Sequence, residues 1–397
     1  MNKLSVRQLN PRGERVFTRV DFNVPLTPTG EVADETRLRA TLPTLTHLRD
    51  RGARLVLASH LGRPEGNDPS LSLAPVAARL ENLLQTKVVM GTDCIGPGVA
   101  EAIGALPPGG ILLLENLRFH PGEKQNDDGF SRQLAALGDI YVNDAFGSCH
   151  RAHASVVGIC AHVREAAAGL LVEDELRALD RLLGESPARP FVAILGGAKV
   201  TDKVPLLDNL LGRVECVLLG GAMAYPFLRA RGVSLGASQV EEEGVSHAGR
   251  LLEESVQRGT EILLPCDHVQ ASSLESGCQW SVTAGDSIQD GWSGVDIGPR
   301  TREQFASRLR QAGTVLWNGP LGLFERPPFD AGSRVIARAL AESTAFSVVG
   351  GGDTAAAVRS FGMQDAFDHI STGGGATLEY LSSGRLPGIS ALSDAPS

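Results

Sequence analysis

The segment FVAILGGAKVTDK, residues 191–203, combines two residue types that bind phosphate. It closes an apolar run with two glycines and then places Lys199 and Lys203 four residues apart, in a chain with only five lysines. Glycine lets backbone N–H groups approach an anion, and a lysine ammonium adds a compact positive charge. On one helix the two ammonium groups would share a face and repel each other unless phosphate lay between them. The segment predicts a phosphate-binding loop, although it lacks the G-x-x-x-x-G-K-[ST] motif.

Glycine clusters follow other apolar runs in the second half, at residues 220–221, 350–352 and 373–375. A tight turn explains each cluster as well as a ligand does, but together they favour a nucleotide lying across several strand ends. Neither the dinucleotide fingerprint G-x-G-x-x-G nor the kinase motifs HRD and DFG occur. Asp353 is suited to hold Mg2+ between phosphate oxygens, and an N-cap role is an equal alternative. Glu325, after WNGPLGLF, could accept ribose hydroxyls.

The first half places cationic side chains where the second half has glycine. These residues and their polar neighbours are Asp21, Asn23, Arg37, His60, Arg63, Arg118, His120, His150, Arg151 and His153. Planar guanidinium groups bind carboxylate and phosphate through paired hydrogen bonds, so several on separate loops suit a small polyanion. One loop arginine is usually a surface charge, but repetition at five strand ends favours an anion site. For the histidines, hydrogen-bonded support of the loops is as good an interpretation as direct chemistry.

Short apolar runs alternate with amphipathic segments, which predicts parallel sheets covered by helices on both faces. Predicted strands lie in residues 16–26, 53–62, 87–91, 109–119, 139–147, 191–197, 216–221, 260–266, 314–320, 345–353 and 369–375. The pattern is typical of two doubly wound, Rossmann-like α/β domains. Residues 170–190 indicate a polar-faced helix that ends in a proline turn and acts as a hinge. We expect domains at 1–170 and 171–385.

Composition excludes several functional classes. The 397 residues exceed what one hydrophobic core usually supports, and the net charge of -9 argues against a nucleic-acid partner. Six cysteines without a CxxC pair signal neither a zinc site nor a dithiol redox motif. There is no apolar signal-peptide core and no run of about 18 apolar residues, so we expect a cytoplasmic protein without a membrane partner.

The two halves of the chain carry different anion-binding groups. This difference predicts an enzyme that transfers a phosphoryl group between two bound partners. One half offers arginines for a small anion, and the other offers backbone N–H groups and an aspartate for a magnesium nucleotide. Such a reaction needs alignment and charge neutralisation more than a nucleophilic side chain. Closure about the hinge would exclude water, which otherwise hydrolyses the phosphoryl donor.

A series of segments makes the chain resemble the phosphoglycerate kinase family over almost its whole length. In order, they are VDFNVP, RLRATLPT, SHLGRP, LLLENLRF, DIYVNDAFG with HRAH, ILGGAKVTDK, WNGPLGLFE, GGGDT and STGGGATLE. The resemblance implies the glycolytic, reversible transfer of a phosphoryl group from 1,3-bisphosphoglycerate to ADP, giving 3-phosphoglycerate and ATP. It also implies a glycerate-binding N-terminal domain, a nucleotide-binding C-terminal domain with Mg2+, a tail 386–397 that packs on the N-terminal domain, and a monomer.

The resemblance also implies roles for individual residues. For 3-phosphoglycerate it implies Asp21, Asn23, Arg37, His60, Leu61, Gly62, Arg63, Arg118 and Arg151. For the nucleotide it implies Gly197, Ala198, Lys203, Gly221, Gly294, Asn318, Pro320, Glu325, Gly351, Gly352, Asp353 and Thr354, with Asp353 as the magnesium ligand. For the transferred group it implies Arg37, Lys199, Gly373 and Gly374.

The chain departs from the family pattern at a few small or apolar residues. Ala222 stands where glycine is usual, Leu321 and Leu323 stand where valine is common, and Pro226 lies early in a helix. The pair Ser148–Cys149 also differs. These changes concern nucleotide affinity rather than the reaction.

Two alternative functions differ in what they predict. A kinase for another carboxylate acceptor would disrupt the glycerate cluster, and a non-catalytic nucleotide-binding protein on this fold would lose Arg37, Lys199 or Asp353. All of these features are present. The kinase with 3-phosphoglycerate as acceptor is therefore the favoured hypothesis.

Overall fold

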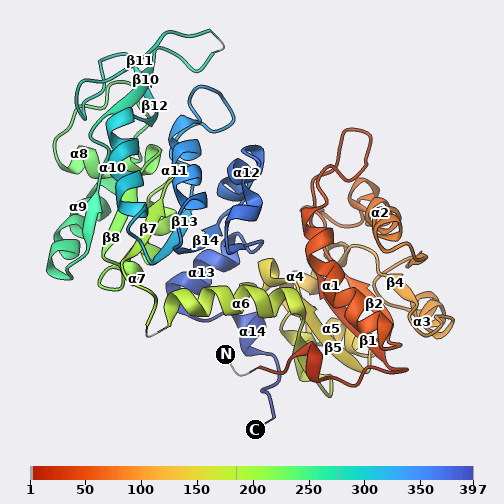
Figure 1. Cartoon of the computed structure of the whole chain (residues 1–397). Coiled ribbons are helices and arrows are strands. Elements are labelled where there is room, and N and C mark those ends of the chain that lie inside the picture. Colours follow the sequence, from red (N-terminus) through yellow and green to blue (C-terminus); the bar gives the residue numbers. More distant parts are fainter. Residues whose placement is uncertain (1–2, 185, 276, 397) are drawn as a thin grey trace. The chain divides into compact units, whose positions relative to one another are not determined.

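The computed structural model describes residues 3–184, 186–275 and 277–396, and the chain divides into two compact units. Unit 1 runs to Arg177 and resumes at Arg385, and unit 2 spans Ala178–Gly384. Each unit contains a six-stranded parallel sheet with helices, so the prediction of two doubly wound α/β units is confirmed (Figure 1). The division falls within helix α6 (Leu170–Leu183), which lies in the segment expected to form the hinge.

Unit 1 is built on the strand order β3-β4-β2-β1-β5-β6, and all its neighbouring pairs are parallel. Its strands are β1 (Arg15–Val20), β2 (Arg54–Ala58), β3 (Val88–Met90), β4 (Ile111–Leu113), β5 (Ile140–Asp144) and β6 (Ala166–Ala168). Its helices, besides the first part of α6, are α1 (Thr36–Asp50), α2 (Ala74–Leu84), α3 (Pro97–Gly104), α4 (Pro121–Gln125), α5 (Asp128–Ala135) and α14 (Pro387–Ser390).

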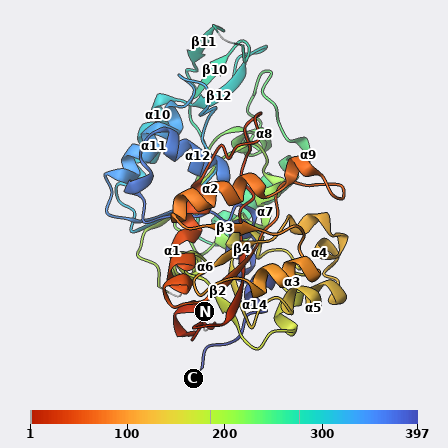
Figure 2. The same cartoon turned by 90° about the vertical axis from the view of Figure 1, so that its right-hand side faces the viewer.

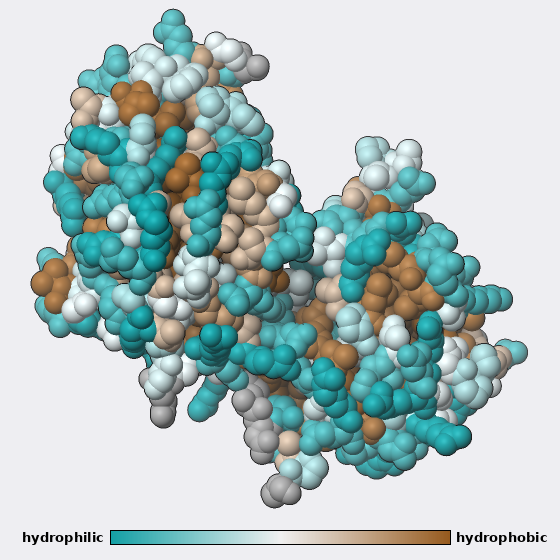
Figure 3. Space-filling view, viewed as in Figure 1, coloured by the Kyte–Doolittle hydropathy of each residue, from teal (hydrophilic) through white to brown (hydrophobic). Residues whose placement is uncertain are grey.

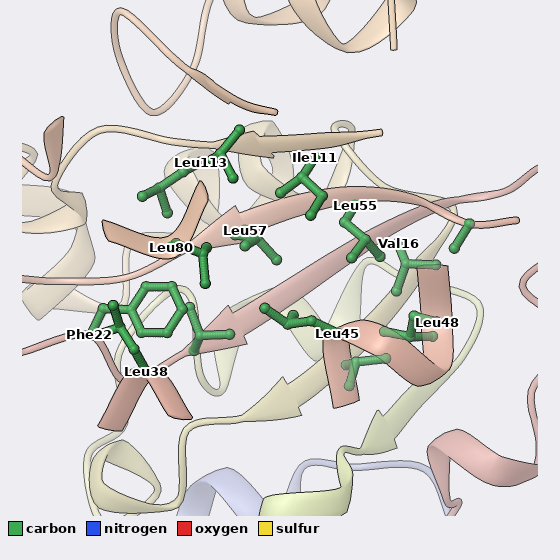
Figure 4. Close-up of a cluster of buried hydrophobic side chains, with 14 of the residues drawn as sticks. Val16, Phe22, Leu38, Leu45, Leu48, Leu55, Leu57, Leu80, Ile111 and Leu113 are labelled. Atoms are coloured by element: carbon green, nitrogen blue, oxygen red, sulfur yellow. The ribbon is translucent and has the colours of Figure 1, made fainter. Parts of the chain in front are cut away.

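Leucine side chains join α1 and α2 to one face of this sheet. In Figure 4, Leu38, Leu45, Leu48 and Leu80 of the helices face Val16, Leu55, Leu57, Ile111 and Leu113 of the strands. Burying one such side chain contributes about 2 kcal/mol. Phe17 and Val56, which alternate with Val16 and Leu55 along their strands, are also buried, so both faces of the sheet are covered. This core positions the strand ends that carry the cationic loops.

The C-terminal residues return to unit 1. Lys3 Nζ donates to Asp394 Oδ1 and to the carbonyl of Leu392, both at 2.8 Å. The backbone N–H of Gly388 donates to the carbonyl of Cys149 at 2.8 Å. The C-terminal segment therefore contacts the loop that follows β5 through the hydrogen bond from Gly388 to Cys149.

Unit 2 has the strand order β15-β14-β13-β7-β8-β9 in its parallel sheet. These strands are β7 (Phe191–Leu195), β8 (Cys216–Leu219), β9 (Glu261–Leu263), β13 (Thr314–Asn318), β14 (Phe346–Gly350) and β15 (His369–Ile370). The helices are α7 (Val204–Leu210), α8 (Tyr225–Ala230), α9 (Glu242–Gln257), α10 (Pro299–Leu309), α11 (Ala331–Ala341), α12 (Gly352–Ser360) and α13 (Gly375–Ser383).

A small antiparallel sheet in unit 2 was not predicted. It has the order β11-β10-β12, with β10 (His268–Ala271), β11 (Trp280–Val282) and β12 (Ser293–Ile297), and lies at one end of the unit (Figures 1 and 2). The predicted strand 16–26 was also too long, because only Arg15–Val20 belongs to the sheet. Residues 21–26 leave the sheet as the loop that carries Asp21 and Asn23.

The strand order places ligand-binding loops at a switch point in each sheet. β1 lies between β2 and β5, and β7 lies between β8 and β13. The next strand in the chain is added on one side of β1 and of β7, and the later strands β5 and β13 are added on the other side. The carboxyl ends of strands at such points form the crevice in which α/β proteins bind ligands. The loops after β1, β2 and β5, and after β7, β8 and β13, are therefore placed for binding.

Hydrophilic residues predominate on the surface in the view of Figure 3, with apolar residues in smaller groups between them. Among the described residues, no helix is both long and apolar enough to span a membrane. All six cysteines are free.

Candidate active site

In unit 1, the loops after β1 and β2 are tied to each other and to α1. Asn23 Oδ1 accepts a hydrogen bond from the backbone N–H of Gly62 at 2.9 Å. Arg37, in the first turn of α1, donates to Asp21 Oδ2 at 2.5 Å. Asp21 thereby orients the guanidinium group of Arg37, which keeps further N–H donors for an anion.

Buried Asn116 connects this region to the loop after β4. Its side chain accepts from the N–H groups of Leu61 and Arg118 at 3.2 and 3.1 Å. Arg118 also donates to the carbonyl of Gly62. The Leu61 side chain belongs to the hydrophobic core. Leu61 and Gly62 thus hold Arg118 in place through their main chains.

The positive charge of this cluster is largely unbalanced. Arg37 pairs with Asp21, whereas Arg63, Arg118 and Arg151 form no ion pair with any described carboxylate. Burial, reinforced by the charges of neighbouring arginines, lowers the pKa of Arg118 to about 10. Its Nε is buried and has no partner among the described residues. Guanidinium groups that repel one another and lack carboxylates form a site for a small polyanion.

His60 lies among these arginines. It is 5% exposed, and Arg19 contacts its Nδ1 at 3.0 Å. Burial pushes the pKa of His60 well below its usual 6.5, and nearby guanidinium charges add to the effect. Those charges belong to Arg19, Arg118, Arg151 and Arg37. Residues from four separate elements therefore converge on one neutral histidine.

Two other histidines of unit 1, His120 and His153, make supporting contacts. His120 lies 2.6 Å from Asp93 and stacks on Phe130. His153 lies 3.6 Å from the buried carboxylate of Glu123. These contacts fit the interpretation of the histidines as supports for the loops.

In unit 2, two glycines after β7 and β13 are required by close backbone packing. A Cβ on Gly196 would lie 2.2 Å from the carbonyl oxygen of Pro320, and one on Gly319 would lie 2.2 Å from that of Gly196. Gly319 also has φ +105°, which other residues rarely adopt. Part of the glycine pattern therefore reflects loop packing rather than a ligand.

The buried side chain of Lys203 connects these two loops. Its Nζ donates to the carbonyls of Gly196 at 2.5 Å and Asn318 at 2.9 Å, and the residue is 9% exposed. Burial lowers the pKa of Lys203 to about 8, although nearby aspartates oppose the shift. An ammonium group has three N–H donors, so one remains for a phosphate.

Lys199 differs from Lys203 in its exposure and in its contacts. It is exposed, and among the described residues its ammonium forms no hydrogen bond or ion pair. Its loop precedes a short 3-10 helix, Thr201–Lys203, and is held by Glu241, which accepts from Val200 N at 2.6 Å. The two lysines therefore do not share one helix face, because α7 begins only at Val204.

A cavity of about 200 Å³ opens beside this loop. Seven residues predicted for the nucleotide line it: Gly197, Ala198, Gly221, Gly294, Pro320, Glu325 and Asp353. Lys203, Asn318, Gly351, Gly352 and Thr354 are not among its lining residues. Ala222 and Leu323, two departures from the family pattern, do line it.

The start of α12 provides polar groups next to this cavity. Gly351 is the N-cap residue, so the alternative of Asp353 as the N-cap is wrong, and the Asp353 carboxylate is exposed in the first turn. Thr354 Oγ1 accepts from Gly319 N at 2.6 Å and joins α12 to the loop after β13. Asn318 Nδ2 is buried without a partner in the described chain. A helix N-terminus with a spare amide donor is suited to phosphate.

Helix α13 begins at Gly375, after the predicted pair of glycines. Gly374 is its N-cap residue with φ +53°, which favours glycine. The N–H of Gly373 donates to Ser371 Oγ at 3.1 Å, so this donor is already used. The unpaired N–H groups at this end therefore come from the first turn of the helix.

Three functional candidates were missed by sequence reasoning. Arg19 lies within β1 and looked like an ordinary strand residue, although its neighbour Asp21 was recognised. Tyr225 lines the cavity, and a Cβ on Gly294 would lie 2.2 Å from its hydroxyl oxygen. Glu241 precedes α9 by one residue, and only the tertiary structure brings it to Val200.

Comparisons with known proteins agree over almost the entire chain. A family model described as phosphoglycerate kinase matches residues 6–384. The chain is 50% identical to the phosphoglycerate kinase of Moorella thermoacetica, over 99% of this chain and 100% of that protein. It is 51% identical to the phosphoglycerate kinase of Rubrobacter xylanophilus, over 99% of this chain and 98% of that protein. Among solved structures, phosphoglycerate kinase from Coxiella burnetii has a TM-score of 0.88 at 39% identity, covering 98% of both chains.

Proposed function

The chain belongs to the phosphoglycerate kinase family, and from this premise we propose how its residues divide the work of the reaction. The enzyme is a glycolytic phosphotransferase that moves a phosphoryl group reversibly from 1,3-bisphosphoglycerate to ADP. The products are 3-phosphoglycerate and ATP.

Unit 1 binds 3-phosphoglycerate through the arginine cluster. The observation that carries this proposal is the set of guanidinium groups around His60, of which Arg118 and Arg151 form no ion pair with a described carboxylate. Asp21 and Asn23 order the first loop. In this assignment, Arg37 contacts the transferred group, and its hydrogen bond to Asp21 orients its guanidinium. A carboxylate and a phosphate on one small molecule supply the negative charge that the arginine cluster lacks.

Unit 2 binds the nucleotide in the cavity beside Gly197. Glycine faces and apolar side chains suit a flat base, and Glu325, which lines the cavity, accepts the ribose hydroxyls in this proposal. The phosphates belong at the polar end, near Lys203, Asn318 and the start of α12. Lys199 carries a free ammonium that can follow the transferred group, aided by N–H groups at the start of α13.

Water must be kept away from the acyl phosphate during transfer, and hinge closure about α6 accomplishes this. We also propose that the enzyme works as a cytoplasmic monomer. The absence of a general basic surplus, with a net charge of -9, supports the assignment of small-molecule rather than nucleic-acid partners.

Mg2+ fits at Asp353. The carboxylate is exposed, lines the cavity and accepts no hydrogen bond from the described residues, and oxygen ligands of this type are those Mg2+ prefers. When bound, the ion neutralises charge on the phosphate oxygens. Asp353 would hold the ion on the nucleotide side of the site.

Asp353→Asn is expected to raise the Mg2+ concentration needed for half-maximal activity about tenfold, because one negative ligand is lost. Calorimetric titration of ATP with and without Mg2+ should show that the variant gains less affinity from the metal. Asp365→Asn, which changes an exposed aspartate just after α12, is the matched control. An unchanged Mg2+ requirement would exclude Asp353 as the ligand.

The function is tested by coupling ATP and 3-phosphoglycerate turnover to a dehydrogenase that consumes the product. We expect turnover that depends on both substrates and on Mg2+. Absence of turnover, with binding of both ligands shown by calorimetry, would contradict the proposed function. Activity with another small carboxylate and none with 3-phosphoglycerate would favour the alternative acceptor.

A further inference from the structure

A buried arginine, Arg19, lies behind the substrate cluster of unit 1. The register of the sheet places it on β1 between Ala58 of β2 and Asn143 of β5, and it is 1% exposed. Its guanidinium contacts His60 Nδ1 at 3.0 Å and Ser148 Oγ at 3.4 Å. Arg19 is thus too buried to meet the substrate as an open ligand, but it touches a residue of the site.

The charge of Arg19 is balanced through a relay rather than by an ion pair. Its Nε donates to Ser155 Oγ at 2.9 Å, and that hydroxyl donates to Glu123 Oε1 at 2.7 Å. Burial raises the pKa of Glu123, but hydrogen bonds from His153 and Ser155 and the charge of Arg19 outweigh it and hold the pKa below its ordinary value. A buried carboxylate therefore faces a buried guanidinium across one hydroxyl.

The contact between Arg19 and His60 determines where the histidine carries its proton. A guanidinium group can only donate hydrogen bonds, so Nδ1 of His60 must be the acceptor. A histidine whose Nδ1 accepts is neutral and carries its proton on Nε2. Among the described residues, Nε2 has no hydrogen-bond partner.

The charged groups with the largest effect on His60 oppose its protonation. They are Arg19 on β1, Arg37 on α1, Arg118 after β4 and Arg151 after β5. The ring therefore remains a neutral donor even though it lies in a site built for anions.

We propose that Arg19, backed by Ser155 and Glu123, is a positioning residue that fixes His60 as the Nε2–H tautomer, so that the ring donates a hydrogen bond to the bound substrate. The donor role rests on the proposed function, because it requires 3-phosphoglycerate in the arginine cluster. The tautomer itself does not depend on that function.

The tautomer is tested by long-range 1H–15N NMR of histidine-labelled, full-length protein without ligand. At pH 7, His60 should show an unprotonated Nδ1 and a protonated Nε2, and should stay neutral at pH values where an ordinary histidine is charged. A protonated Nδ1, whether in the other tautomer or in the imidazolium, would overturn the proposal.

Arg19→Met tests the link to substrate. We expect a mixture of His60 tautomers, a KM for 3-phosphoglycerate about tenfold higher and a KM for ATP within about twofold of wild type. Ser155→Ala should produce the same changes to a smaller extent, and it carries the test if Arg19→Met does not fold. An altered tautomer with an unchanged KM for 3-phosphoglycerate would overturn the positioning role.

Arg15→Met is the matched control, because Arg15 lies at the other end of the same strand and pairs with Asp139. It should lower stability without changing the tautomer or either KM. If wild-type protein shows the expected tautomer but no turnover, the proposed function fails and the assignment of the tautomer stands. If it shows turnover but the wrong tautomer, only the inference about Arg19 fails.

Discussion

Lys199→Ala is expected to lower kcat about a thousandfold while changing the Kd for ADP by less than about threefold. Lys199 is exposed on the loop after β7 and forms no hydrogen bond or ion pair with the described residues. A charge without ground-state partners is free to interact with the phosphoryl group as negative charge develops on it. Such an interaction lowers the barrier by about 4 kcal/mol without contributing to the binding of ADP.

Steady-state kinetics and calorimetry with ADP measure the two effects separately. Lys87→Ala is the control, because Lys87 is an exposed lysine of unit 1 outside the cluster, and it should leave both quantities unchanged. Equal losses in kcat and in ADP affinity would mean that Lys199 anchors phosphates already in the ground state.

Lys203→Met is expected to weaken ADP binding about thirtyfold, with a smaller loss in kcat, because the ammonium serves both the loops and the phosphates. In the free enzyme it bonds the carbonyls of Gly196 and Asn318, so methionine leaves these acceptors without their cation. An unchanged Kd for ADP would contradict a role for Lys203 at the nucleotide.

The pH dependence of stability gives an independent check on Lys203. The folded pKa of about 8 lies below the ordinary value of 10.5. Below pH 8 the lysine is protonated in both states, and the cost of burying the charge is fully present. As pH rises from 8 to 10.5 the folded state releases its proton while the unfolded state keeps it, so this group's contribution to the unfolding free energy increases by about 3 kcal/mol. Urea titrations should show a rise in wild type that Lys203→Met lacks.

Much of the fold could be predicted because the parallel strands are continuous apolar runs. FVAIL in β7 and the strands on either side of it are buried on both faces, and such runs carry a clear signal. Strand β11 of the antiparallel sheet was missed because it is exposed throughout, with Trp280 51% exposed, so no burial pattern marks it. β6 was missed because Ala166–Ala168 contains only alanine, which has little preference for strands.

The sequence by itself determined the inventory of the site: arginines after the strands of one half, glycines after those of the other, and two lysines in one segment. The order of the motifs was enough to indicate the family. The residue types themselves follow from the chemistry of binding anions. The resemblance gave the two lysines different roles, but residue type and spacing did not show that one would be buried and the other exposed.

Only the tertiary structure decided what each charge contacts. The pairing of β7 with β13 brings Asn318 to Lys203 and buries that ammonium, while Lys199 stays exposed four residues earlier. The register of β1 likewise turns Arg19 from a plain strand residue into the partner of His60. The physical reason is that desolvation and hydrogen bonding depend on neighbours in space, and those neighbours come from strands far apart in the sequence.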